Sequence, residues 1–151
     1  MIVRRALPDD APAVAPLLGE LGYPSSAQAV TTRFARLAES ENDPAWVAVE
    51  PHSEETLLGF AAGHLFWLYE LDRPVAELTA LVVAEQSRGS GAGRDLVAAF
   101  EEWARAAGSL RATVASSFHR TGAHAFYERL GYGQRSKKFE KQFTASSTLT
   151  H

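Results

Sequence analysis

Residues 81–93 of this chain read LVVAEQSRGSGAG, an apolar run that leads into a loop with three glycines and an arginine. Glycine lets the backbone adopt left-handed conformations, and the backbone N–H groups of such a loop can surround an oxyanion. Apolar residues at helical spacing follow the loop: Leu96, Val97, Phe100, Trp103, Ala104 and Ala107. The loop therefore opens a helix whose N-terminal dipole also favours an anion, and the stretch predicts a phosphate-bearing ligand.

Other glycine-rich motifs fit this stretch poorly. A nucleoside-triphosphate loop ends in Gly-Lys-Ser/Thr, whereas Arg94 and Asp95 follow the last glycine here. A dinucleotide fingerprint counted from Gly89 would need its third glycine where Arg94 stands. A nucleophile elbow would need glycine in place of Arg88. A glycine-rich turn without a ligand remains the alternative.

Two motifs resemble those of the GNAT N-acetyltransferase superfamily. The pattern Arg88-x-x-Gly91-x-Gly93, preceded by Leu-Val-Val, resembles its acetyl-coenzyme A loop. Residues 120–132, RTGAHAFYERLGY, resemble its later motif, in which a short helix carries Ala and Phe-Tyr and ends in Leu-Gly-aromatic. The resemblance extends from about residue 2 to residue 143. It implies an enzyme that moves an acetyl group from acetyl-CoA to a primary amine in a ternary complex.

The expected elements agree with that resemblance. Strands are predicted over residues 2–6, 46–50, 57–69, 75–83 and 110–115, with one or two closing strands over 132–143. Helices are predicted from Pro8 to Leu21, after the glycine loop, and over 121–130. A further helix is predicted after the break at residues 22–26, with apolar residues at helical spacing from Val30 to Ala38 and Asn42-Asp43-Pro44 ending it. This is an α/β fold, a GNAT-like mixed and mainly antiparallel sheet of order βααβββαβαβ(β) with helices on both faces. We expect one domain over residues 1–143 and a polar tail over 144–151.

Composition limits the class of protein without singling one out. A chain of 151 residues with 46% hydrophobic residues can bury one core. It has no cysteine, which excludes disulfides, thiolate metal sites and a cysteine nucleophile. We see no signal peptide and no apolar run long enough to span a membrane, so a cytoplasmic location is expected.

Charge is distributed unevenly along the chain. Residues 1–72 include eleven acidic and four basic residues, a net charge of −7. Residues 73–151 include seven acidic and eleven basic residues, a net charge of +4. The basic half contains the loop expected to meet polyanionic coenzyme A, and the acidic half suits a cationic amine acceptor. A solvated surface with uneven charge is the alternative. No basic stretch interleaved with aromatics suggests nucleic acid.

The resemblance assigns residues to the coenzyme. The family's strand before the loop bulges and directs backbone N–H groups at the thioester, a place occupied here by Leu81 and Val83. Arg88 and Arg94 flank the loop and are expected to contact phosphate oxygens. The full set of expected coenzyme contacts is Leu81, Val83, Arg88, Gly89, Ser90, Gly91, Ala92, Gly93, Arg94, Arg120, Ala123 and Phe126.

Tyr127 is the expected general acid. A phenol stays protonated at neutral pH and can give its proton to the departing thiolate, and the family's tyrosine in Phe-Tyr-x-x-Leu-Gly falls on this residue. The alternative is that Tyr127 only packs on the apolar face of its helix, with Ala123, Phe126 and Leu130.

The base is expected on the strand that leads into the loop. Strand alternation would put Glu77, Thr79, Leu81 and Val83 on one face, so Glu77 could act on the amine through a water. His64 is the competing base, or a structural histidine. Two further carboxylates, Glu70 and Asp72, could instead bind a cationic acceptor. The remaining histidines, His52, His119, His124 and His151, have no metal-ligand spacing, and no metal is predicted.

Two other classes of function stay open: an acetyl-CoA-binding sensor that has lost catalysis, and a partner-binding module on the same fold. The residues that choose the acceptor are expected in 23–39 and 66–73. Trp67, Leu68 and Tyr69 end a predicted strand, and alternation cannot bury all three on one face. A homodimer is the preferred explanation, with a pocket-lining aromatic or burial under the first two helices as alternatives.

Overall fold

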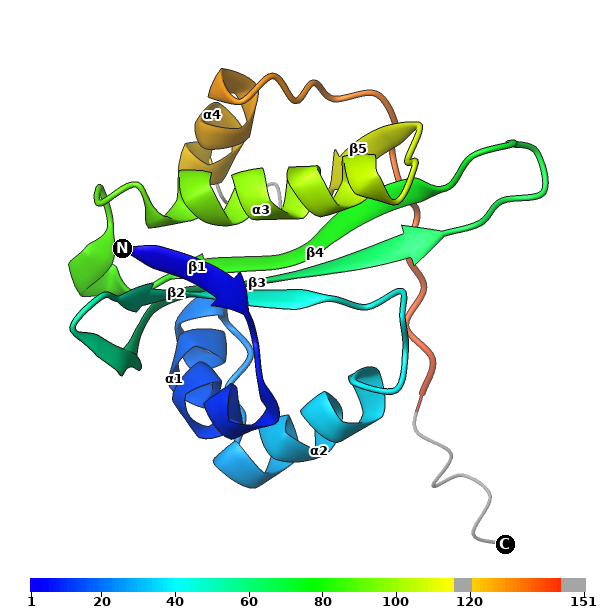
Figure 1. The fold of residues 1–151 in the computed structure, drawn as a ribbon. Helices are drawn as coiled ribbons and strands as arrows, with labels where there is room; N and C mark the ends of the chain where they lie inside the picture. The colour runs from blue at the N-terminus through cyan, green and yellow to red at the C-terminus, as the bar shows by residue number, and fades with distance from the viewer. Residues whose placement is uncertain (116–120, 145–151) are drawn as a thin grey trace, which may run out of the picture. The chain divides into compact units, whose positions relative to one another are not determined.

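The computed structural model describes residues 1–115 and 121–144. The chain divides into a large compact unit, Met1–His119, and a small one, Arg120–His151. The large unit is built on a five-stranded sheet in the spatial order β1-β2-β3-β4-β5 (Figure 1). Its antiparallel strands are β1 (Ile2–Arg5), β2 (Ala45–Glu50), β3 (Ser53–Phe66) and β4 (Val75–Val83), whereas β5 (Arg111–Val114) runs parallel to β4. The expected mixed, mainly antiparallel sheet is confirmed.

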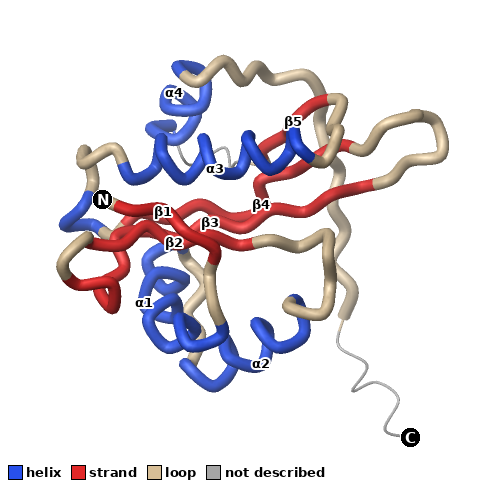
Figure 2. The backbone as a smooth tube through the Cα atoms, viewed as in Figure 1, coloured by secondary structure: helices blue, strands red, loops and turns tan. Residues whose placement is uncertain are grey.

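Helices cover both faces of this sheet. In Figure 2, α1 (Ala11–Leu21) and α2 (Ala27–Leu37) lie on one face, and α3 (Ala92–Ala106) lies on the other. α3 connects β4 to the parallel strand β5, a connection that needs a crossover. The apolar stripes of α1 and α2 meet alternate residues of the strands in one buried cluster, which includes Val14, Leu17, Val30, Val47, Val49, Phe60 and Val82.

The opposite face holds α3 against an aromatic group. The ring of Trp46 lies edge-on to Phe100 and Trp103, with centroids 6.2 and 5.8 Å away. Two glycines of β3 let the helix approach the strand closely. A Cβ at Gly59 would lie 2.9 Å from the Leu96 side chain, and one at Gly63 would lie 3.1 Å from Phe100. This packing fixes where the N-terminus of α3 lies relative to the end of β4.

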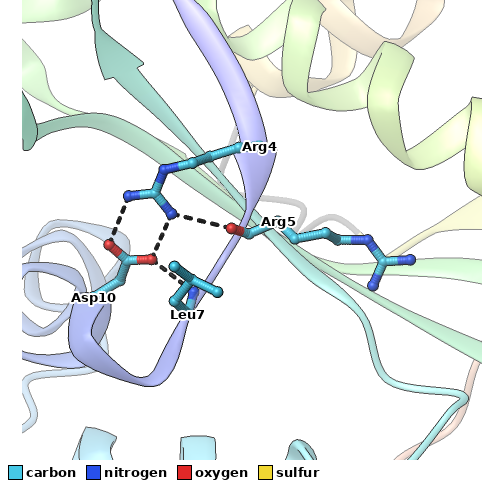
Figure 3. Close-up of polar contacts among 4 residues, drawn as sticks. All are labelled: Arg4, Arg5, Leu7 and Asp10. Carbon is cyan, nitrogen blue, oxygen red and sulfur yellow. Dashed lines mark hydrogen bonds and ion pairs between the residues drawn. The ribbon is translucent and has the colours of Figure 1, made fainter.

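The turn before α1 is held by Asp10 (Figure 3). Residues Pro8–Asp10 form a 3-10 turn, η1, that continues into the helix. Both carboxylate oxygens of Asp10 accept hydrogen bonds from the Arg4 guanidinium, at 2.8 and 2.9 Å, and one also accepts the Leu7 amide at 2.7 Å. The predicted helix start at Pro8 therefore lies in the turn that Asp10 stabilises.

Two predicted strands differ from the structure. β3 begins at Ser53 and ends at Phe66, so residues 67–69 lie in the loop to β4 and not in a strand. The closing strands predicted over 132–143 are wrong, because residues 133–144 contain no strand. Phe139 and Phe143 in this stretch are 99% and 88% exposed, so neither is part of a buried strand face. A strand also needs a partner edge, which local sequence cannot provide.

Candidate functional site

Strand β4 departs from regular pairing at Thr79. Ala62 of β3 pairs with Ala80, but the next residue, Gly63, pairs with Leu78, so Thr79 is an extra residue on β4. The resemblance implied a bulge in this strand, and the structure has one here.

The bulge changes which face each residue of β4 occupies. Val83 lies opposite Gly59, which faces α3, so Val83 and Leu81 project toward α3. Glu77 lies opposite His64. His64 is an odd number of residues after Gly59 on β3, whose side chains alternate regularly, so His64 and its partner Glu77 project from the face opposite α3. The expectation that Glu77 shares a face with Leu81 and Val83 is wrong, because the extra residue inverts the alternation between them.

In the described part of the chain, the bulged part of β4 has an open edge. β5 pairs only with residues 75–78 of β4, and no other described strand continues along that edge. The Ala84 amide donates to Leu58 of β3 at 2.8 Å. Backbone groups alternate in direction along a strand, so those of Leu81 and Val83 point away from β3, toward the open edge.

A compact loop connects this edge to α3. It begins with a 3-10 turn, η2 (Glu85–Ser87), and the side chain of Glu20 from α1 accepts the Glu85 amide at 2.9 Å. Ser87 is buried, whereas Gly89 and Gly91 have φ angles of +84° and +91°. Only glycine adopts this left-handed backbone without strain, so both positions need it.

The loop ends at the N-terminus of α3. Gly91 is the N-cap, and its carbonyl accepts the Asp95 amide at 3.0 Å, the first bond of the helix. The hydroxyl of Ser90 accepts the first helical amide at 3.3 Å. The next two amides, of Gly93 and Arg94, have no carbonyl within the helix to meet. They and the helix dipole form a site suited to an anion.

Two arginines lie beside this N-terminus. A guanidinium nitrogen of Arg94 would be 3.1 Å from a Cβ at Gly91, so the side chain lies back over the loop. Its Nε is 3.5 Å from Asp95, and its side chain is 69% exposed. Arg88 is also exposed, at the end of η2. The positive charge is therefore available to a ligand on the loop.

The other face of the sheet carries Glu77 in a polar setting. Its carboxylate accepts a hydrogen bond from the Thr113 hydroxyl at 3.1 Å, and its cross-strand neighbour His64 bonds Asp43 through Nδ1 at 2.6 Å. Glu70 and Asp72 lie in the exposed loop before β4. No motif in the sequence indicated a role for Asp43 or Thr113. Asp43 lies 21 positions before His64, and no local pattern signals that the two meet.

The small unit carries the second motif. In α4 (Thr121–Arg129) the side chains of Ala123, Phe126 and Tyr127 are half-buried, and the Tyr127 ring centroid is 5.2 Å from Phe126 and 6.0 Å from Tyr132. Gly131, with φ of +94°, ends the helix, and the Tyr132 amide donates back to the Tyr127 carbonyl at 3.0 Å. Arg120 lies outside the described residues.

In the part of the chain that the structure describes, no three histidine, aspartate or glutamate side chains are grouped so that they could hold a metal ion. Over the same residues, no helix combines the length and the apolar character needed to cross a membrane.

Comparisons with known proteins agree with this geometry. The sequence profile of the Acetyltransferase (GNAT) family matches residues 13–132. Over 67 residues the chain is 39% identical to the aminoalkylphosphonate N-acetyltransferase of Salmonella typhimurium, a match that spans 44% of each protein.

Solved structures share the whole fold. A protein from Agrobacterium tumefaciens, assigned as an acetyltransferase, has a TM-score of 0.84 and 26% identity over 95% of this chain and 100% of its own. An aminoglycoside acetyltransferase from an uncultured soil sample, in complex with sisomicin, has a TM-score of 0.78 at 16% identity over 96% of each chain. The second likeness shows the fold alone. With the profile matching most of its length, this chain belongs to the GNAT family of acetyltransferases.

Proposed function

We propose that this protein transfers the acetyl group of acetyl-CoA to a primary amine by direct attack in a ternary complex. The observation that carries the proposal is the continuous backbone surface from the open edge of β4, through two left-handed glycines, to the N-terminus of α3. Such a surface suits a ligand with an amide-rich arm and a pyrophosphate. Coenzyme A has both.

The loop residues fit the pyrophosphate. The amides of Gly93 and Arg94, the dipole of α3 and the guanidinium groups of Arg88 and Arg94 would all favour its negative charge. Further contacts from Gly89, Ser90, Gly91, Ala92, Arg120, Ala123 and Phe126 are part of the proposal, on the grounds of the family resemblance. The backbone groups of Leu81 and Val83 would hydrogen-bond the pantetheine arm and the thioester carbonyl.

The chemistry then needs two proton transfers. A neutral amine attacks the thioester carbon, the C–S bond breaks, and the thiolate takes a proton from the Tyr127 hydroxyl in our proposal. Glu77 of β4, acting through a water, is the candidate base that accepts the proton lost by the amine. Since Tyr127 also lies against two aromatic rings, packing is the competing role for this residue.

The acceptor is proposed to be cationic. Two carboxylates, Asp43 and Glu77, flank His64 on the face opposite α3, and the first 72 residues carry a net −7. An amine without an adjacent anionic group suits this setting best. The Salmonella relative is named for aminoalkylphosphonates, and one structural neighbour was solved with sisomicin, so both kinds of amine belong in a test.

The test pairs isothermal titration with acetyl-CoA and a thiol-release assay over spermidine, sisomicin, 2-aminoethylphosphonate and a lysine-containing peptide. We expect acetyl-CoA binding and thiol release with at least one amine, fastest with a polycation. Binding without release for every amine would favour the sensor. No affinity for acetyl-CoA would favour the partner-binding module and contradict the proposal.

A further inference from the structure

Four polar side chains form a row across the sheet on the face opposite α3. His64 of β3 pairs with Glu77 of β4, and Glu77 pairs with Thr113 of β5. Directly paired residues project from the same face, so these three side chains are neighbours. Asp43, from the segment before β2, completes the row through its bond to His64. We call Asp43, His64, Glu77 and Thr113 the polar row.

The backbone places Asp43 opposite His64. The two amides that flank His64, of Gly63 and Leu65, donate to the carbonyls of Pro44 and Asn42, at 2.9 and 3.0 Å. Pro44 has no N–H to return a bond, which is why β2 begins only at Ala45 although the chain already runs alongside β3. The hydrogen bonds on both sides of the pair hold the carboxylate against the imidazole.

A second contact also orients the imidazole. The ring centroid of Phe66 lies 4.7 Å from that of His64, in an edge-on contact. The Thr113 hydroxyl donates to Glu77 at 3.1 Å and so limits the rotation of that carboxylate. Each group that could take part in proton transfer is therefore held by a neighbour from a different strand or segment.

The polar row is open to solvent. The side chain of His64 is 36% exposed and that of Asp43 is 21% exposed. The next residues on this face, Ala62 and Ala80, pack against the apolar cluster under α1 and α2. The row thus lies immediately beyond the part of the sheet that the helices cover, where a solute can reach it.

The arrangement suits a proton acceptor. A carboxylate that receives Nδ1–H leaves Nε2 to accept a proton and then stabilises the resulting imidazolium. Histidine is the side chain best matched to proton transfer near neutral pH. Two carboxylates on either side of the imidazole also attract a cation.

We propose that His64 is the base that deprotonates the acceptor, with Asp43 as its positioning residue and Glu77 binding the ammonium group. The inference rests on the proposed acetyl transfer and replaces Glu77 by His64 as the base, so that Glu77 binds the acceptor instead. The N–H bond of the ammonium breaks as the Nε2–H bond forms, and the amine keeps the electron pair for its attack on the thioester carbon. That proton then passes from Nε2 to solvent. The second proton, which the nitrogen loses once the C–N bond has formed and the C–S bond has broken, returns through solvent to the Tyr127 oxygen that protonated the thiolate.

His64→Gln should lower kcat about 10²- to 10⁴-fold, the usual worth of general acid–base catalysis, with little change in KM for acetyl-CoA. Asp43→Asn should lower kcat less. Glu77→Gln should mainly raise KM for the amine. Free imidazole should restore turnover to His64→Ala in a concentration-dependent way, which a purely structural histidine would not show. The matched control is His52→Gln, in an exposed turn, which should leave kcat unchanged.

A binding readout separates this inference from the proposed function. In ¹⁵N-histidine NMR, the Nε2 signal that His64→Gln removes should shift when spermidine is added, whether or not acetyl-CoA is turned over. If no amine gives thiol release, the proposed acetyl transfer is overturned. Three results would overturn the role of His64. The first is an Nε2 signal that does not shift on addition of spermidine, and the second is a kcat of His64→Gln equal to that of the parent. The third is a loss of turnover in His64→Ala that free imidazole does not restore.

Discussion

Asp10 accepts two hydrogen bonds from Arg4 and one from the Leu7 amide. These bonds affect the pKa of its carboxyl group. Burial by itself would raise the pKa of Asp10, but the bonds from Arg4 and Leu7 outweigh it and hold that pKa below its ordinary value. A carboxyl group with a lowered pKa in the folded state stabilises the fold above the pKa of the unfolded chain, about 4. That contribution is lost as the pH falls through the lowered folded value.

Asp10→Asn should therefore reduce the free energy of unfolding at pH 7 by about 1–2 kcal/mol. The difference from the parent should shrink at pH 3 and below, where the parent carboxylate is also becoming protonated. Urea unfolding at both pH values measures this. Asp9→Asn, which removes the same charge from an exposed neighbour, should cost little at either pH. An equal loss for both variants would show that net charge, and not the Arg4 contact, matters.

Tyr127 allows a second prediction at the level of one residue. Tyr127→Phe keeps the ring that packs against Phe126 and Tyr132 and removes only the hydroxyl. If that hydroxyl protonates the thiolate, kcat should fall about 10²- to 10⁴-fold while acetyl-CoA affinity stays the same. Tyr132→Phe, from the same ring cluster, is the control and should retain turnover. A loss below about threefold in Tyr127→Phe, with chemistry shown to be rate-limiting, would leave packing as its role.

At the scale of secondary-structure elements, β4, the loop that follows it and α3 together form the proposed coenzyme site. Gly91 has φ of +91° at the N-cap. A Cβ built on it would have, apart from its chain neighbours and among the described residues, only atoms of the flexible Arg94 side chain within 4 Å. The space beside this glycine is therefore available to a ligand. Packing of Leu96 and Phe100 against Gly59 and Gly63 of β3 holds the helix that begins there.

Gly91→Val should weaken acetyl-CoA binding about tenfold or more, because a side chain strains the N-cap and occupies the approach of the pyrophosphate. Isothermal titration measures the affinity. Gly108→Val is the matched control. The φ of Gly108 is +80°, no atom of the described residues beyond its chain neighbours lies within 4 Å of a Cβ built there, and this glycine follows the other end of α3. It should cost similar stability and leave affinity unchanged. A folded Gly91→Val protein with parent affinity would contradict the loop assignment.

At the scale of the whole molecule, the loop between β3 and β4 exposes three large side chains. Trp67 is 64% exposed, Leu68 39% and Tyr69 fully. The alternative that they are buried under the first two helices is therefore wrong. Exposed aromatics grouped in this way are typical of a contact surface or a ligand pocket. The homodimer stays our preferred prediction.

Light scattering at micromolar concentration should give about twice the chain mass of 16.4 kDa. Trp67→Ser or Tyr69→Ser should shift the mass toward that of one chain. Phe139→Ser removes an equally exposed aromatic from the small unit and should leave the mass unchanged. A parent mass near 16.4 kDa would leave the pocket as the role of the loop.

Local patterns were enough to predict most elements. Helical spacing and breaking residues predicted α1, α2, α3 and α4, and alternation predicted β4 to the residue. The glycines of the loop also pointed to left-handed backbone, which Gly89 and Gly91 adopt. These features depend on neighbours in the chain, which is why the amino-acid sequence determines them. The single domain over 1–143 and the roles of the site residues stay predictions.

Tertiary structure alone decided the side of the sheet that Glu77 occupies, the partner of His64 and the lack of a strand in residues 133–144. Each depends on how strands pair, and one extra residue at Thr79 inverts the faces of residues 75–78 of β4 relative to those after it. The sequence around Asp43 predicted only the end of a helix, whereas pairing of residues 42–44 with β3 places Asp43 beside His64. Alternation along one strand predicts which residues share a face, but only pairing between strands determines which side chains meet.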